Sequence, residues 1–227
     1  MPWDHPAAAR LLMRVARNAG PAPVQARLNT ARPSHLEQRR AAYEAAGMVL
    51  FQEKEGFTWA GSPVTVPDRL TFSPVHAVGR SAYRDVLARC GKGTLDRNDA
   101  WYRRLAGPTN WGSVFMTFCG AGDEDTWLLA SLPSGSPVGV VAVSAFGEPG
   151  VATVAFIGVV PEQRGHGYVD DLLRAGTAAA RDAGYTSMLS DADVLNEPMT
   201  AAFVRAGHLP GRRPWHVWHY RFPSEVR

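Results

Sequence analysis

Val159-Val160-Pro161-Glu162-Gln163-Arg164-Gly165-His166-Gly167-Tyr168 is the stretch that decides the fold. The apolar run over residues 151–160 predicts a strand, and the proline ends it before a short loop with two glycines. Helical spacing follows, so the loop leads into a helix that begins near Tyr168. The N–H groups at a helix N-terminus, with the positive end of the helix dipole, suit an anion such as a pyrophosphate. Gly165 and Gly167 let the backbone turn sharply and approach such a ligand.

The composition is that of an ordinary globular protein. A chain of 227 residues can form one full domain and a smaller piece. A formal net charge of +3 does not favour a nucleic-acid partner. No apolar run reaches membrane-spanning length, and the N-terminus has no apolar stretch with a cleavage site. Cys90 and Cys119 fit a reduced compartment better than a disulfide scaffold. We therefore expect a cytoplasmic protein with no nucleic-acid or membrane partner.

An α/β pattern runs from residue 70 to residue 222. The strands are expected at residues 70–75, 127–132, 138–146, 151–160, 187–189 and 215–222. The helices are expected at residues 81–89, 96–105, 168–183 and 198–206. Ser81 and Asp96 are candidate N-caps of the first two helices, and the apolar residues 114–119 fit either a strand or a helix.

This order of elements, with the glycine loop in its place, resembles the GNAT acetyltransferase superfamily over roughly residues 68–222. The acyl-CoA signature of that family, Q/R-x-x-G-x-G/A, has its counterpart in Arg164 to Val169. Val169 departs from the pattern, because the family prefers glycine or alanine there. The resemblance implies an α/β acyltransferase fold, with a mixed, mostly antiparallel sheet flanked by helices and a catalytic domain over residues 68–227.

The resemblance also implies where acetyl-CoA is held. Backbone N–H groups from Arg164 to Val169 would bind the pyrophosphate, the preceding strand would part from its neighbour, and the N–H near Val159 would polarise the thioester carbonyl. Glycine inside a strand often marks a close backbone approach, although a plain buried strand is the alternative. Asn196 matches an asparagine that contacts the cofactor in many relatives, or else caps a helix. The expected cofactor residues are Ile157, Gly158, Val159, Arg164, Gly165, His166, Gly167, Tyr168, Val169 and Asn196.

Transfer of an acetyl group to an amine requires a base, because an alkylammonium group has a pKa of ~10. The resemblance places this catalytic base five residues before Asn196, at Asp191, with Asp193 as the alternative. Both aspartates also suit a polar loop. Many relatives carry a tyrosine acid seven residues after the asparagine, where this chain has Phe203. A thiol of pKa ~8.5 can leave as the thiolate at neutral pH, so the loss is chemically tolerable.

The remaining polar side chains form no recognisable metal site. The seven histidines lack ligand spacing with cysteines or acids, and His216 and His219 point to opposite faces of an alternating strand. We therefore expect no metal. Substitutes for the missing acid are Tyr168, His166, His216 and Tyr220, each of which also suits an ordinary packing or surface role.

The first 65 residues contain a partial second copy of the pattern. Residues 41–47 align with residues 201–207 with four identities, and residues 11–20 and 49–59 echo the last long helix and the final strands. This N-terminal partial repeat, residues 1–65, resembles the back half of a second GNAT domain, although alanine-rich helices that end in glycine also look alike. Because half a domain cannot bury its own faces, we expect it to pack on the complete domain or on a second chain, which leaves a homodimer open.

The first functional hypothesis is an N-acetyltransferase that moves an acetyl group from acetyl-CoA directly to the amine of a small molecule. One alternative keeps the fold but uses another acyl-CoA or an oxygen acceptor. The other is a CoA-binding module without turnover, which Phe203 and the truncated repeat keep open.

Overall fold

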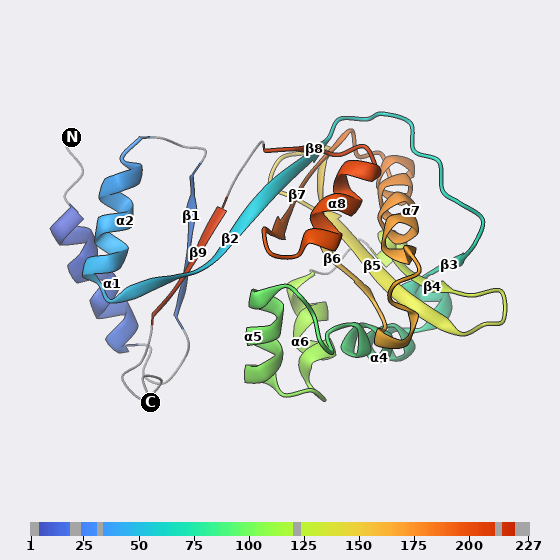
Figure 1. The fold of residues 1–227 in the computed structure, drawn as a ribbon, viewed down its shortest axis with the longest axis horizontal. Coiled ribbons are helices and arrows are strands. Elements are labelled where there is room, and N and C mark those ends of the chain that lie inside the picture. The colour runs from blue at the N-terminus through green and yellow to red at the C-terminus, as the bar shows by residue number, and fades with distance from the viewer. Residues whose placement is uncertain (1–4, 19–23, 31–33, 120–123, 212–214, 221–227) are drawn as a thin grey trace. The chain divides into compact units, whose positions relative to one another are not determined.

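The computed structural model describes residues 5–18, 24–30, 34–119, 124–211 and 215–220 (Figure 1). Its contacts divide the chain into two compact units. One unit contains Met1–Glu55 and Arg212–Arg227, and the other contains Gly56–Gly211.

The first unit pairs the N-terminal segment with the last strand of the chain. Its elements are α1 (His5–Asn18), β1 (Gln25–Asn29), α2 (Leu36–Ala45), the first part of β2 (Met48–Trp59) and β9 (Trp215–Tyr220). Strand β9 is antiparallel to both β1 and β2, with Leu28 opposite His216 and Met48 opposite Tyr220. The order helix, strand, helix, strand over the N-terminal segment agrees with the expectation from the sequence.

Strand β9 pairs with strands that lie before the domain boundary expected at residues 65–68. We placed this strand in the domain over residues 68–227, but it is hydrogen-bonded to β1 and β2, and the compact units divide at residues 55–56 and 211–212. Trp218 packs in a small core with Leu28, Ala46 and Met48. Strand periodicity shows which residues share a face, but not which strand they pair with.

The second unit is built on an open sheet. Its strands are β3 (Thr71–Pro74), β4 (Trp127–Ser131), β5 (Pro137–Ala145), β6 (Val151–Val159) and β7 (Ser187–Asp193). They lie in the order β7-β6-β5-β4-β3. Only the β6–β7 pair among these is parallel. The short strand β8 (Leu209–Pro210) pairs with Phe57 and Thr58 at the end of β2.

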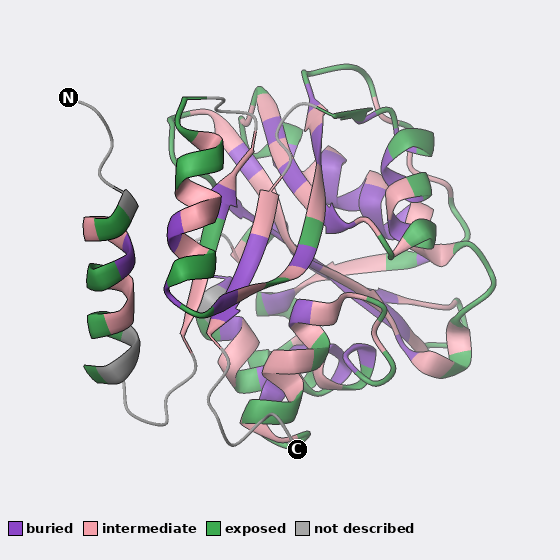
Figure 2. Ribbon diagram, turned by 60° about the vertical axis from the view of Figure 1, so that its left-hand side comes forward, coloured by how far each residue is buried: buried purple, intermediate pink, exposed green. Residues whose placement is uncertain are grey.

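Helices cover both faces of this sheet (Figure 1). One face carries α3 (Val75–Val78), α4 (Arg80–Cys90), α5 (Arg97–Ala106) and α6 (Trp111–Phe118), and the other carries α7 (Tyr168–Asp182) and α8 (Glu197–Arg205). The turns η1 (Glu124–Thr126) and η2 (Pro161–Gln163) precede β4 and α7. In Figure 2 the buried residues lie mainly on the strands and on the helix faces turned toward them.

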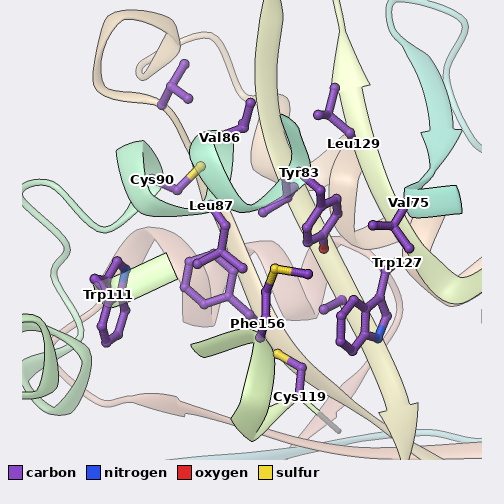
Figure 3. Packing of buried hydrophobic residues seen from close by; sticks show 14 residues of the cluster. Val75, Tyr83, Val86, Leu87, Cys90, Trp111, Cys119, Trp127, Leu129 and Phe156 are labelled. Atoms are coloured by element: carbon purple, nitrogen blue, oxygen red, sulfur yellow. The ribbon is translucent and has the colours of Figure 1, made fainter. Parts of the chain in front are cut away.

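Aromatic side chains fill the core between α4, α6 and the sheet. Tyr83 and Trp127 are fully buried with their rings 6.0 Å apart, and Phe156 of β6 lies in the same cluster (Figure 3). The Tyr83 hydroxyl donates to the Val141 carbonyl at 3.0 Å, so the buried phenol keeps a hydrogen-bond partner. This packing fixes α4 against β5 and β6, and β6 leads into the glycine loop.

Three local expectations are settled by the structure. Asp96 caps α5, since its carboxylate accepts from the N–H groups of Asn98 and Asp99 at 2.9 and 3.0 Å. Ser81 is not a cap, because α4 already begins at Arg80 after Gly79. Residues 114–119, which fitted either a strand or a helix, fall largely in α6.

Candidate active site

The glycine loop joins β6 to α7 through two residues in the left-handed backbone region. Gly165 has φ 84° and Gly167 has φ 74°, and Gly167 is the N-cap of α7. Side chains rarely adopt these angles, so the backbone path of the loop favours glycine at both positions. The Asp170 N–H already bonds to the Gly167 carbonyl at 3.1 Å, whereas the N–H groups before it lack an acceptor one helical turn earlier and can bind a ligand.

A pocket of about 490 Å³ opens beside this loop. Its lining combines the end of β6, the loop, the first turn of α7, the start of α8 and the segment after α4. Nine of the ten residues expected to hold the cofactor line it, and His166 is the exception, with its ring 5.5 Å from that of Tyr168. Cys90, Leu95, Met199 and Arg205 line the pocket as well and were not expected.

Strands β6 and β7 part where the pocket begins. Their parallel pairing is limited to Val151 with Ser187 and Ala152 with Met188. Beyond these pairs, the N–H of Val154 on the β7 side of β6 bonds to the side-chain oxygen of Ser190 at 3.0 Å instead of to a main-chain carbonyl. Strand β6 also has a bulge against β5, since Ala142 faces Phe156 and Val143 faces Val154. A bulge bends its strand, so the second half of β6 turns away from β7.

The edge of β6 that faces the gap carries the main-chain groups of Val159. The Val160 N–H donates to the Val138 carbonyl of the neighbouring segment at 2.9 Å. Because bonded residues alternate along an antiparallel pair, the N–H and C=O of Val159 point to the opposite edge. The Val159 carbonyl there accepts from the Arg164 Nε at 3.1 Å. Its N–H points to the same edge of β6.

Gly158 is required by close packing against α4. A Cβ at this position would lie 2.7 Å from the Cβ of Cys90. The Cys90 thiol donates to the Gly158 carbonyl at 3.3 Å. Burial raises the pKa of this thiol to about 12, so the sulfur stays protonated and unreactive at neutral pH. Cys90 is therefore a packing residue of the pocket wall.

Arg164 holds the loop by its side chain. Its guanidinium donates to the carbonyls of Cys90 at 2.9 Å, Lys92 at 2.7 Å and Gly93 at 3.0 Å, in addition to Val159. Its N–H is also engaged, with the Pro161 carbonyl at 3.3 Å. The Arg164 side chain thus ties the segment after α4 to the end of β6, and the main-chain contact with a phosphate expected for Arg164 stays a prediction.

The two candidate bases occupy different environments at the end of β7. This strand extends to Asp193, beyond the expected end at residue 189, so both aspartates lie on a strand. Asp193 is fully buried and accepts from the main-chain N–H and the guanidinium of Arg97 at 2.9 to 3.1 Å, and from the Leu195 N–H at 3.0 Å. Asp191 is half-buried and, two residues earlier, shares the face of β7 that carries Asp193. Asn196 is the N-cap of α8 without a side-chain capping bond, and it lines the pocket.

Phe203 lies in the apolar core beneath α8. Its ring stacks on that of Phe57, with centroids 4.4 Å apart, and only 1% of the residue is exposed. Val169, which departs from the family signature, packs against the same cluster. Of the substitutes considered for the acid, His216 and Tyr220 belong to β9 in the first unit. Tyr168 alone among the four lines the pocket.

Two arginines beside the first turn of α7 were missed in the sequence. Arg69 pairs with Asp171, and Arg205 pairs with Asp170. The adjacent aspartates signalled a need for cationic partners, but the sequence does not show which of many arginines provide them.

Within the described ranges, no three His, Cys, Asp or Glu side chains are grouped to hold a metal ion. None of the helices in those ranges is both long enough and apolar enough to span a bilayer.

A family model described as the Acetyltransferase (GNAT) family matches residues 94–208. No curated protein matches the sequence. A GCN5-related N-acetyltransferase from Kribbella flavida has a TM-score of 0.59 at 16% identity, over 100% of this chain and 81% of that one.

Two further solved structures share the fold. A tandem GNAT protein from the clavulanic acid biosynthesis pathway has a TM-score of 0.60 at 17% identity, over 93% of this chain and 67% of that one. A GCN5-related N-acetyltransferase from Sphaerobacter thermophilus has a TM-score of 0.58 at 15% identity, over 91% of this chain. This chain spans 63% of the length of the Sphaerobacter protein. At these identities the likeness concerns the fold alone.

Proposed function

Because this chain belongs to the acetyltransferase (GNAT) family, we propose that it is an N-acetyltransferase that moves an acetyl group from acetyl-CoA directly to the amine of a small molecule. The observation that carries the proposal is the pocket of about 490 Å³ at the parting of β6 and β7, lined by the loop, the strand end and Asn196. The two buried free cysteines support the cytoplasmic setting that we propose.

The residues present suit an acyl-CoA. The main-chain N–H groups around Gly165 and Gly167, at the N-terminus of a helix of 15 residues, would hold the pyrophosphate. The outward main-chain edge of Ile157 and Val159 would pair with the pantetheine arm. The Val159 N–H would then donate to the thioester carbonyl, where negative charge develops during transfer.

Acyl-CoA supplies a thioester, whose C–S bond breaks as the new amide bond forms. The chain must first remove a proton from the acceptor ammonium. We assign this step to Asp191, directly or through a water molecule, because the lone pairs of Asp193 are already taken by Arg97 and Leu195. Phe203 provides no acid, so the thiol leaves as the thiolate.

A second candidate function is acyl-CoA binding without turnover. It is favoured by Phe203, which occupies the position of the family's tyrosine acid and is packed on Phe57. Transfer of a different acyl group, or transfer to an oxygen, remains the third candidate and would use the same pocket.

The test combines binding and turnover. Acetyl-CoA, longer acyl-CoAs and free CoA are first added in thermal-shift experiments, and release of CoA thiol is then followed with a panel of small amines and alcohols. Asp191→Asn should lower kcat by about a hundredfold or more at neutral pH and leave acetyl-CoA affinity unchanged. Asp182→Asn, which replaces an exposed aspartate at the far end of α7, is the matched control.

The outcomes separate the three candidates. Stabilisation by acetyl-CoA with amine-dependent thiol release supports the N-acetyltransferase. Stabilisation without release across the panel supports the binding module, and release only with alcohols or with longer acyl-CoAs supports the third candidate. A protein that no acyl-CoA stabilises would contradict all three.

A further inference from the structure

The first turn of α7 carries two adjacent carboxylates beside the pocket. Asp170 and Asp171 follow Tyr168 and Val169, both of which line the pocket. Carboxylates in the first turn stabilise a helix through its dipole. The same charges oppose a polyanion at that N-terminus, because like charges a few ångströms apart repel each other.

Each carboxylate is matched by an arginine from a distant part of the second unit. The Arg69 Nη2 lies 2.7 Å from the Asp171 carboxylate and its Nε donates to it at 3.0 Å. The Asp171 side chain is only 3% exposed, so this pairing supplies the counter-charge that a buried carboxylate needs. Burial nevertheless raises the pKa of Asp171, against the opposing effect of Arg69.

Arg69 also contacts the glycine loop itself. Its Nη1 donates to the His166 carbonyl at 3.3 Å. Its guanidinium carbon lies 5.3 Å from the centre of the Tyr168 ring, which is within cation–π range. A Cβ at Gly167 would lie 3.9 Å from the Arg69 Nη2. The same side chain thus neutralises Asp171 and contacts both His166 of the loop and Tyr168 at the start of α7.

Arg205, at the end of α8, makes the second pair. Its Nε and Nη2 donate to the two carboxylate oxygens of Asp170, each at 2.7 Å. This two-point geometry raises the pKa of Arg205 through the hydrogen bonds that its guanidinium donates to Asp170. Arg205 lines the pocket, and Arg174 donates to its carbonyl at 2.7 Å.

We propose that Arg69 and Arg205 are positioning residues that cancel the charges of Asp171 and Asp170, so that the N-terminus of α7 presents its positive dipole to the phosphates of the cofactor. The inference rests on the proposed acyl-CoA function. It assigns these two arginines a role in phosphate affinity, although neither belongs to the glycine loop. Acetyl-pantetheine lacks the nucleotide and its phosphates, so its binding should not depend on the two pairs.

The Arg205–Asp170 pair gives the sharpest test, because it is exposed enough to change without loss of the fold. Acetyl-CoA affinity is measured by calorimetry for the unaltered protein, Arg205→Gln, Asp170→Asn and the double variant. Arg205→Gln should raise Kd about fivefold, Asp170→Asn should lower it, and the double variant should return close to the unaltered value. Raising the salt from 0.05 to 0.5 M should shrink these differences.

The role of Arg69 is tested by measuring the Kd of acetyl-CoA and of acetyl-pantetheine. Arg69→Gln should raise the Kd of acetyl-CoA more than Arg205→Gln does, because it also releases the His166 carbonyl and the Tyr168 ring. The double variant Arg69→Gln with Asp171→Asn should recover the part of the acetyl-CoA affinity that depends on charge. It should not recover the part that depends on the contacts of Arg69 with His166 and Tyr168. Arg181→Gln is the matched control, since Arg181 pairs with Asp182 in the last turn of α7, roughly 20 Å away.

The affinities of these variants either support or overturn the proposed role of Arg69 and Arg205. The proposal is supported if Arg205→Gln and Asp170→Asn shift the Kd of acetyl-CoA in opposite directions while the Kd of acetyl-pantetheine stays the same in both variants. Equal weakening by Arg205→Gln, Asp170→Asn and their double variant, or an equal effect on acetyl-pantetheine binding, would show a structural role and overturn it. Unchanged affinity in the variants overturns this inference alone, whereas an unaltered protein that binds no acyl-CoA overturns the proposed function with it.

Discussion

Phe203 lies flat on Phe57, with ring centroids 4.4 Å apart and an interplanar angle of 10°. Both side chains are almost fully buried. Phe57 comes from β2, so this contact places the position of the family's tyrosine acid inside an apolar core. The geometry explains how the chain keeps the fold while losing the acid.

Phe203→Tyr should therefore not restore an acid. The added hydroxyl would be buried among apolar side chains, and we expect the free energy of unfolding to fall by about 1–3 kcal/mol. Urea denaturation gives this value, and the kcat of the same variant is measured beside it. A rise in kcat with unchanged stability would contradict the packing described for this ring.

Asp193→Asn should destabilise the protein without acting as a base mutation. Its carboxylate is fully buried and accepts four hydrogen bonds, three of them from Arg97. Removing one partner of a buried ion pair costs about 3–5 kcal/mol. Chemical denaturation should show this loss in the free energy of unfolding, and the pH profile of kcat should keep the same shape. A stable variant with an altered pH profile would return Asp193 to the role of the base.

The Asp193–Arg97 pair shows which features can be predicted from the sequence and which cannot. The glycine loop, the order of the elements and the Asp96 cap follow from local patterns, because glycines, turns and caps act within a few residues. The end of β7 was placed too early, since Ser190 to Asp193 has the composition of a loop. The carboxylate at its end, Asp193, is bound by Arg97, which lies 96 residues away in the chain, and no local pattern shows this contact.

Long-range pairing sets the same limit elsewhere. The alternation in residues 215–220 predicts a strand, but its pairing with β1 and β2 is a property of the folded chain. Likewise, Asp170 and Asp171 have the charge that suits the first turn of a helix, whereas their partners Arg205 and Arg69 are separated from them by 35 and 102 residues. Charge alone does not select two arginines among so many.

Gly158→Ala should damage the pocket wall. The new methyl group would lie 2.7 Å from the Cβ of Cys90 and 3.2 Å from the Phe156 ring. Overpacking of this kind costs about 1–3 kcal/mol, and denaturation of the variant measures it. Combining it with Cys90→Ala should not restore stability, because alanine keeps the clashing Cβ. Full recovery in the double variant would contradict the assigned clash.

Acid should destabilise the protein through His208. The Thr177 hydroxyl donates to the Leu173 carbonyl at 2.8 Å, so it accepts from the His208 Nε2 at 3.1 Å, and the ring is the neutral Nε2–H form. Burial lowers the pKa of His208 to about 4, whereas an unfolded histidine has a pKa of ~6.5.

The sign of this effect follows from proton uptake. Between pH ~6.5 and about 4 the unfolded chain binds a proton at His208 that the folded chain does not, so stability falls as the pH falls through this window. The loss reaches up to about 3 kcal/mol. Denaturation at pH 7 and pH 4.5 measures it, and His208→Gln should show a smaller difference than the unaltered protein. An identical difference in both would contradict the assignment.

The central claim is that the glycine loop binds the phosphates of acetyl-CoA, and calorimetric titration of Gly167→Asp tests it most directly. Aspartate tolerates the left-handed backbone of this position better than most residues do, and Gly167→Asn has the same shape without the charge. We predict that Gly167→Asp binds acetyl-CoA about tenfold or more weakly than Gly167→Asn, with both proteins folded. Equal affinity of the two variants and the unaltered protein would contradict the account.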